Sequence, residues 1–443
     1  MAVQLSLRQS DILVKLAKLL ISKKPNHKKT YQMKFWKKLS HPDINKKISR
    51  ALRENVNFKN DTTLGIPASK LDGEVFYDSA SFLKDAPILR TFVQNPNHIG
   101  CHTLGESEAF FAGTQALERE LIDLLAYDVL KGDDDAFDGY VASGGTEANI
   151  QAIWMYRNYF KREFKATHEE IAIISSADSH YSMPKAGNIL NLDWLEVPVE
   201  FKTRQIIVDE LDAVVSKAME SGKKYFIVVS NMATTMFGSV DNPDVYVDVM
   251  QKYNLDFKMH VDGAFGGFIY PISNPDSMVN FRNPHISSIT LDAHKMLQAP
   301  YGTGIFIARK DLMKFVFTEE AQYVSGMDIT LSGSRSGANA IAVWMILFTY
   351  GPFGWLEKIN KLLYRTTWLT NQLDEMGIRY FRDDKMNIVT MEAEFIPDEV
   401  VKKYGLVPQT HTGDNKWFKV VVMDHVELDD LEKFIVDLKS ARQ

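Results

Sequence analysis

Between residues 171 and 308, the chain alternates short apolar, β-rich runs with stretches of helical periodicity, and this alternation limits the folds that it can adopt. The strand-like runs are residues 171–174, 195–199, 225–229, 257–261, 288–291 and 304–308, and helical stretches such as 208–219 and 244–253 separate several of them. Apolar strands that alternate with helices predict a mainly parallel sheet covered on both faces. Ligands of such sheets bind beyond the carboxyl ends of the strands, so the residues just past those ends are the first candidates for a functional site.

Length and composition predict that this sheet belongs to a large globular protein. The chain has 443 residues, of which 45% are hydrophobic and 24% charged, which suits two or three structural units. We expect a basic helical segment over residues 1–65, a large α/β domain over 66–330 and a small C-terminal α+β domain over 331–443. The single cysteine, Cys101, allows no disulfide within the chain and no Cys-rich zinc site. Since the first 20 residues also lack the pattern of a secretory signal, we expect a cytoplasmic protein without a metal site.

The start of the chain is strongly basic. Residues 1–60 contain 15 Lys and Arg against 3 Asp and Glu, a charge of +12 that leaves −18 for the rest of the chain at a total of −6. Such a segment can bind nucleic acid. Its basic residues are, however, interleaved with apolar residues at helical spacing, among them Ile12, Leu16 and Leu19. We therefore favour an amphipathic arm that packs on the acidic remainder or on a partner subunit, and we expect neither a nucleic-acid nor a membrane partner.

A glycine-containing loop, residues 143–149, joins a strand-like run at 139–142 to a helical run. Adjacent Gly144 and Gly145 let the backbone turn tightly and approach a ligand closely, and a helix N-terminus offers free N–H groups with a partial positive charge. Together with the hydroxyl of Thr146, these features suit a phosphate. A turn in which Thr146 caps the helix explains the same residues without a ligand. It is not a Walker loop, because no Lys-Ser/Thr pair follows the glycines.

Polar residues follow four of the predicted strands, among them His180, Thr235, Asp262 and Lys295. A phosphate loop, a flat histidine, an aspartate and a lysine at strand ends are the groups that pyridoxal 5'-phosphate (PLP) requires. Lys295 can bond to the aldehyde, Asp262 can hold the ring nitrogen protonated, and His180 can stack on the ring. Singly, each residue has a structural explanation, such as a solvated loop lysine beside a helix-capping Asp292. Their coincidence at successive strand ends of one α/β unit favours the cofactor.

Four motifs in this order resemble the group II PLP-dependent amino-acid decarboxylases, which include glutamate, histidine, tyrosine and aromatic-amino-acid decarboxylases. They are residues 143–149, 179–182, 260–264 and 292–296. The resemblance covers roughly residues 95–350 and implies the fold of the aspartate aminotransferase superfamily (fold type I), with a mainly parallel sheet of the seven-stranded kind. It also implies a homodimer with the active site at the subunit interface. By position, it implies cofactor contacts from Gly145, Thr146, His180, Thr235, Asp262, Ala264, His294 and Lys295.

The resemblance also bears on the proton donor and on the substrate. The family's mobile catalytic loop carries a tyrosine that protonates Cα, and its best local match is Tyr323, with Lys295 and His180 as alternative donors. Candidate substrate contacts are His98, Thr103 and Arg335. Arg335 can pair a carboxylate through two hydrogen bonds, or equally contact a neighbouring subunit's phosphate site. Ala233 departs from the family pattern, because many members have glycine there.

These residues predict the decarboxylation of an L-amino acid to the amine and carbon dioxide, with either an aromatic, tyrosine-like substrate or an acidic one, aspartate or glutamate. Cysteine desulfurases share the His-Lys pair but need a cysteine nucleophile after the lysine, and no cysteine follows Cys101. Two alternatives stay open. One is a carbon–carbon lyase or aldolase of the same fold, which uses the same electron sink. The other is a PLP-binding homologue that has a structural or regulatory role and no activity.

Overall fold

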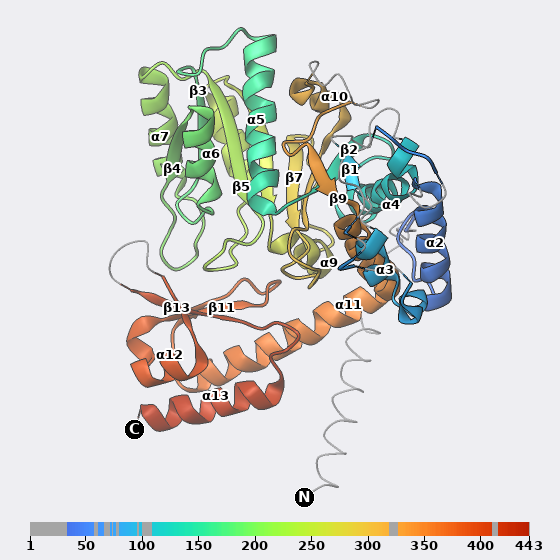
Figure 1. The fold of residues 1–443 in the computed structure, drawn as a ribbon. Coiled ribbons are helices and arrows are strands. Elements are labelled where there is room, and N and C mark those ends of the chain that lie inside the picture. The colour runs from blue at the N-terminus through green and yellow to red at the C-terminus, as the bar shows by residue number, and fades with distance from the viewer. Residues whose placement is uncertain are drawn as a thin grey trace, which may run out of the picture. The chain divides into compact units, whose positions relative to one another are not determined.

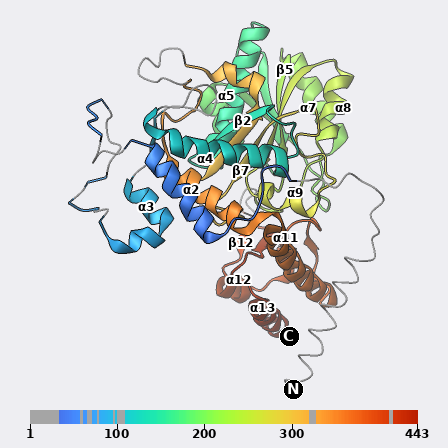
Figure 2. The ribbon, with the colours of Figure 1, turned by 90° about the vertical axis from the view of Figure 1, so that its right-hand side faces the viewer.

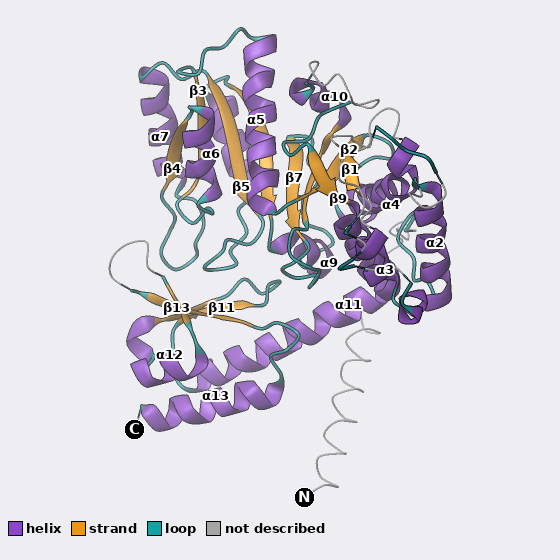
Figure 3. Ribbon diagram, in the orientation of Figure 1, coloured by secondary structure: helices purple, strands orange, loops and turns teal. Residues whose placement is uncertain are grey.

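The structure is a computed structural model that describes residues 33–56, 61–65, 71–72, 74–76, 79–94, 97–99, 109–318, 327–409 and 415–442. A seven-stranded sheet in the order β2-β8-β7-β6-β5-β3-β4 lies at the centre of the large domain (Figures 1 and 3). Its strands are β2 (Phe137–Ala142), β3 (Ile171–Ser176), β4 (Asp193–Val197), β5 (Tyr225–Asn231), β6 (Asp256–Gly263), β7 (Ile286–Asp292) and β8 (Gly304–Arg309). Strands β4, β3, β5, β6 and β7 pair in parallel, and β8 runs antiparallel to both of its neighbours. The predicted mainly parallel sheet is confirmed.

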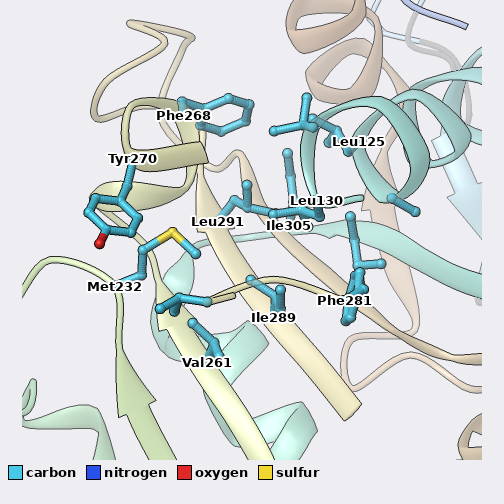
Figure 4. Packing of buried hydrophobic residues seen from close by; sticks show 14 of the residues in the cluster. Leu125, Leu130, Met232, Val261, Phe268, Tyr270, Phe281, Ile289, Leu291 and Ile305 are labelled. Carbon is cyan, nitrogen blue, oxygen red and sulfur yellow. The ribbon is translucent and has the colours of Figure 1, made fainter. Parts of the chain in front are cut away.

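Helices cover both faces of this sheet, because its strands are apolar on both sides. One face packs against α4 (Ala112–Asp123), α7 (Val208–Glu220), α8 (Pro243–Lys252) and α11 (Gly337–Glu375). The other face packs against α5 (Gly145–Glu163), α6 (Ser182–Leu190) and α10 (Lys310–Met313). Figure 4 shows part of the apolar cluster on the first of these faces, which includes Ile289 and Leu291 of β7 together with Leu125 and Leu130. Each fully buried side chain of this size contributes roughly 1.5–3 kcal/mol.

The two faces of β6 and β7 differ in chemistry, because successive side chains of a strand point to opposite sides. Val261 and Ile289 enter the first apolar cluster. The side chains of the opposite parity form a polar stripe that hydrogen-bonds to α5 and consists of His260, Asp262, Ser288, Thr290 and Asp292. All five residues are at most 6% exposed. Buried polar groups are costly unless they are hydrogen-bonded, so a polar stripe within an otherwise apolar face points to a function.

A small antiparallel sheet forms the C-terminal part of the fold, as predicted. Its order is β10-β11-β13-β12, with β10 (Tyr380–Phe381), β11 (Ile388–Glu392), β12 (Val407–Pro408) and β13 (Trp417–Val421). It shares an apolar cluster with α12 (Asp398–Tyr404), α13 (Leu428–Ala441) and the end of α11. Phe35–Gln443 form one compact unit, and the domain boundaries at residues 65 and 330 stay a prediction.

Helix α11 joins the two sheets. The sequence predicts two helices here, over residues 340–349 and 355–376, and the structure confirms two helical halves that meet at a kink at Gly351, where φ is +64° and Pro352 follows. A side chain at Gly351 would also meet the backbone nitrogen of Lys38 at 2.8 Å. Although α11 is long and apolar enough to cross a membrane, 50% of its most apolar window is buried in the fold, as in the core helix of a globular protein.

The described part of the segment before the sheet contains helices. Helix α2 (His41–Glu54) lies along α4, and Lys47 pairs with Glu120 across them at 2.6 Å (Figure 2). The earlier helices predicted within residues 1–65 lie outside the described residues. Helix α3 (Pro87–Gln94) and the short pair β1 (Asn97–Ile99) and β9 (Ser334–Ser336) had no counterpart in the sequence prediction, because their local patterns are irregular.

Candidate active site

A cavity of about 340 Å³ lies where α5 begins, beside the carboxyl ends of β6 and β7. It is lined by residues of the 143–149 loop and by His180, Tyr181, Ala264, Asp292, His294 and Lys295. A smaller cavity shares His180, Ala264 and Lys295 with it and adds Asn231, Thr235 and Asp262. Every predicted cofactor residue, Gly144, Gly145 and Thr146 included, therefore lines one of these two adjoining spaces.

One end of the larger cavity is the N-terminus of α5. Gly144 holds the N-cap position and has no side chain to cap the helix, so Thr146 lies in the first turn and is not the cap. A Cβ on Gly145 would meet Asp292 Oδ2 at 2.9 Å and the Ala264 Cβ at 3.2 Å, which explains the glycine at this position. A helix start that has no N-cap side chain and opens onto a cavity fits the phosphate of PLP.

The other end is built around Asp262, which is 6% exposed. Its Oδ1 accepts a hydrogen bond from the Ala264 backbone at 3.1 Å, and its Oδ2 accepts one from the Asn149 amide at 2.9 Å. His180 lies beside it, and its Nδ1 is 2.9 Å from the Ser182 hydroxyl. Burial lowers the pKa of His180, with Lys295 acting in the same direction and Asp262 in the opposite one. A neutral imidazole beside a buried carboxylate fits the pyridine ring of PLP.

Lys295 projects between these two ends. Its Nζ lies 3.5 Å from Asp292 Oδ2, and the Gly145 backbone donates to Asp292 Oδ1 at 3.0 Å. The pKa of Asp292 is raised to about 6, mainly by burial, with Lys295 acting to lower it and Asp262 to raise it. His294 Nδ1 is 3.2 Å from Asp292 Oδ1, although the contact lacks the geometry of a hydrogen bond. Asp292 caps no helix, since a turn follows β7, and it ties the lysine to the phosphate loop instead.

The small sheet also reaches the site. Ala233 has a φ of +75°, the left-handed conformation that favours the glycine found in many family members. Ala233 begins a loop whose carbonyls accept hydrogen bonds from the small sheet. Lys419 Nζ of β13 donates to the Thr235 carbonyl at 2.8 Å, and Thr390 Oγ1 of β11 donates to the Met236 carbonyl at 2.9 Å. Burial lowers the pKa of Lys419, and the charge of Lys295 lowers it too.

The candidate substrate residues are placed less completely. Arg335 is not among the described residues that line the two cavities, and its NH1 and NH2 lie 2.5 and 3.2 Å from the Glu118 carboxylate. The His98 backbone pairs with Arg335 between β1 and β9, and the His98 side chain lies outside what the structure describes. Thr103 and Tyr323 also lie outside the described residues, so their roles stay predictions.

Three residues at the site were missed by sequence reasoning: Asn149, His260 and Lys419. Two of them had a signal in the sequence. His260 precedes Asp262 by two residues, so both lie on one face of the strand, and Asn149 follows Gly145 by four residues, so both lie on one side of the helix. Lys419 had none, because it comes from the other sheet.

Comparison with known proteins assigns this geometry to a family. Residues 114–386 match the model of the pyridoxal-dependent decarboxylase conserved domain. The chain belongs to this family. The decarboxylase is 58% identical to the tryptophan decarboxylase of Clostridium sporogenes, over 92% of this chain and 98% of that one. It is 31% identical to the L-aspartate decarboxylase of Thermococcus kodakarensis, over 74% of this chain and 83% of that one.

Solved structures show the same fold for the decarboxylase. L-methionine decarboxylase from Streptomyces sp. 590 superposes with a TM-score of 0.65 at 19% identity, covering 90% of this chain and 93% of that one. Glutamate decarboxylase from Lactobacillus brevis superposes with a TM-score of 0.64 at 17% identity, covering 98% of this chain and 92% of that one. The predicted fold type, family and cofactor are confirmed, and the chain is a PLP-dependent amino-acid decarboxylase.

Proposed function

We propose that this enzyme decarboxylates an aromatic L-amino acid, with tryptophan as its main substrate and tryptamine as the product. The observation that carries the proposal is the 58% identity to a tryptophan decarboxylase across 98% of that protein. The relatives named as aspartate decarboxylases are much more distant, for example 31% identical over 83% of the protein from T. kodakarensis.

The position of Arg335 supports an aromatic substrate over an acidic one. Arg335 was the candidate partner for a second carboxylate, but both of its terminal nitrogens face Glu118, whose side chain is fully buried. Separating such a buried pair would leave an uncompensated charge at a cost of roughly 3–5 kcal/mol. Tyr181 presents an aromatic ring to the larger cavity and is 56% exposed, with its centroid 4.0 Å from that of His180.

In the proposed reaction, each residue of the site has a separate role. When bound, PLP supplies an aldehyde for the substrate amine and a ring that accepts the electrons of the breaking Cα–carboxylate bond. Thr146 and the first turn of α5 would hold its phosphate, and Asp262 would hold a proton on the ring nitrogen. His180 would cover one face of the ring. Lys295 would exchange places with the substrate amine, and Tyr323 would return a proton to Cα.

The proposal includes a homodimer in the cytoplasm, with the active site at the subunit interface. In support, large apolar side chains before the sheet are exposed in the single chain, including Leu64 at 96%, Phe82 at 62% and Leu89 at 50%. Exposed apolar side chains mark a protein interface where they form one contiguous surface. A monomer in sedimentation at catalytic concentrations would contradict this part of the proposal.

The substrate is tested by offering the PLP-loaded enzyme equal concentrations of tryptophan, tyrosine, phenylalanine, aspartate and glutamate, and identifying the amines by mass spectrometry. We expect tryptamine to dominate, and Lys295→Ala to form none. β-Alanine or γ-aminobutyrate as the main product would overturn the aromatic assignment while leaving the family assignment intact.

A further inference from the structure

Asn149 of α5 is the junction of a buried hydrogen-bond network behind the cofactor site. Its amide nitrogen lies 2.9 Å from Asp262 Oδ2 and 3.0 Å from the Ser182 hydroxyl. Its Oδ1 lies 3.0 Å from His260 Nε2. Asn149, Ser182 and His260 are at most 1% exposed, so none of these contacts can be replaced by bulk water. The network therefore has to satisfy its own donors and acceptors.

The direction of each hydrogen bond follows from the carboxylate end. Because a carboxylate only accepts, Asn149 has to turn its amide nitrogen toward Asp262 and its oxygen toward His260. His260 Nε2 therefore carries a proton, and its Nδ1 accepts from the Ser288 hydroxyl at 2.7 Å. The Thr290 hydroxyl lies 3.2 Å from the same Nε2 as a second acceptor. Burial lowers the pKa of His260 to about 4, which keeps this imidazole neutral near pH 7.

A second branch of the network reaches the histidine that stacks on the ring. The Ser182 hydroxyl accepts the other N–H of Asn149 and so donates to His180 Nδ1 at 2.9 Å. The Ser182 backbone N–H also points at this Nδ1, at 3.3 Å. Since Nδ1 accepts, the proton of His180 lies on Nε2. One amide orientation at Asn149 thus sets both the contact to Asp262 and the tautomer of His180.

The opposite orientation of Asn149 is disfavoured at Asp262, and at His260 as well when Nε2 carries the proton. A flipped amide would turn its oxygen toward the Asp262 carboxylate and its nitrogen toward the N–H of His260, and both contacts are repulsive. From this geometry, we propose that His260 is a positioning residue. By donating to Asn149 Oδ1, it fixes the amide that holds Asp262 and His180 ready for the cofactor. His260 itself lines neither of the two cavities formed by the described residues.

The proposal rests on the PLP site and is independent of which amino acid is decarboxylated. It is therefore tested by cofactor binding in the absence of substrate. His260→Phe keeps a ring of similar size and removes the donor, whereas His260→Gln retains an N–H. We expect the PLP dissociation constant of the apoenzyme, measured by fluorescence quenching, to rise roughly tenfold in His260→Phe, and His260→Gln to restore most of the affinity.

A double-mutant cycle separates positioning from mere stability. If His260 acts through Asn149, His260→Phe should change the PLP dissociation constant by less than about twofold in an Asn149→Ala background. Thr366→Val is the matched control, because Thr366 is a fully buried hydroxyl that donates only within α11, to the Leu362 carbonyl at 2.8 Å. It should lower the melting temperature without changing PLP affinity. Additive effects in the cycle, or a His260→Phe variant that behaves like Thr366→Val, would overturn the proposal.

A further measurement reports on the wild-type network directly. In wild-type enzyme with ¹⁵N-labelled histidine, the nitrogen shifts of His260 should show a neutral ring protonated on Nε2 near neutral pH, with the signal assigned by its loss in His260→Gln. A ring protonated on Nδ1, or a charged ring, would overturn the proposal.

Discussion

Asp241 is a buried carboxylate that supports the site from behind β5, and its ionisation should be visible in the stability of the enzyme. It is 2% exposed, and its Oδ2 accepts hydrogen bonds from the backbone and the side-chain amide of Asn231, both at 2.8 Å. Burial raises the pKa of Asp241 from 3.8 to about 7, although the hydrogen bonds from Asn231 lower it. The folded enzyme keeps this proton up to neutral pH, whereas the unfolded chain releases it near pH 4.

The sign of the effect follows from proton binding. Between about pH 4 and 7, the folded state binds more protons than the unfolded state, so the free energy of unfolding falls as the pH rises. The pKa difference between 3.8 and about 7 corresponds to a change of about 4 kcal/mol in the free energy of unfolding, at roughly 1.4 kcal/mol per pKa unit. Asp241→Asn keeps an oxygen acceptor for Asn231 and carries no charge. Relative to wild type, its free energy of unfolding should therefore increase by about 4 kcal/mol between pH 4 and pH 8.

Urea denaturation of the cofactor-free proteins, followed by tryptophan fluorescence from pH 4 to pH 8, measures the difference in the free energy of unfolding between wild type and Asp241→Asn. Asp241→Ala is the control, because it leaves the two N–H groups of Asn231 without this acceptor. It should be less stable than Asp241→Asn by a constant amount at every pH. If wild type and Asp241→Asn have parallel pH profiles, Asp241 does not ionise at a cost in the folded enzyme and the reasoning is refuted.

Other expected outcomes concern the cofactor site directly. Asp262→Ala should lower turnover by several powers of ten in a carbon dioxide release assay, and unchanged activity would remove Asp262 from its assigned role. A Cβ on Gly304 would lie 2.2 Å from the Gly144 carbonyl carbon, so Gly304→Ala should displace the phosphate loop and raise the PLP dissociation constant roughly tenfold. Gly333→Ala is the comparison, because its Cβ meets nothing within 4 Å and Gly333 is not among the described residues that line the two cavities; equal losses in both variants would argue against displacement of the loop. Arg335→Met should lower the free energy of unfolding by roughly 3 kcal/mol in urea titrations, because it leaves the Glu118 charge buried and unpaired, and the double variant with Glu118→Met should recover much of that loss.

The sheet was predictable because its strands are short, apolar and separated by helices. The residues at strand ends could be found for the same reason, since Asp262 and Lys295 each follow a strand-like run in the sequence. Their coincidence with the glycine loop and His180 predicted one site, and the structure brings these residues together around two adjoining cavities.

The contacts that could not be predicted join residues that are far apart in the sequence. Lys419 reaches Thr235 from a different sheet, and no local pattern marks it. The junction at Asn149 needs the helix to be laid across His260 and Asp262 before its contacts exist. The kink at Gly351, by contrast, was predictable as a break between two helices, because glycine and proline interrupt helical periodicity locally.

The hydrogen bonds from the small sheet to the loop after β5 should affect hybrid enzymes made by exchanging C-terminal domains. The matched family segment ends at residue 386, but the donors that hold this loop, Thr390 and Lys419, lie beyond it. Both donate to main-chain carbonyls, so they do not depend on which side chains stand at 235 and 236. C-terminal domains exchanged between distant relatives should therefore preserve cofactor affinity when the incoming domain carries donors at these two positions, and lose it when it does not.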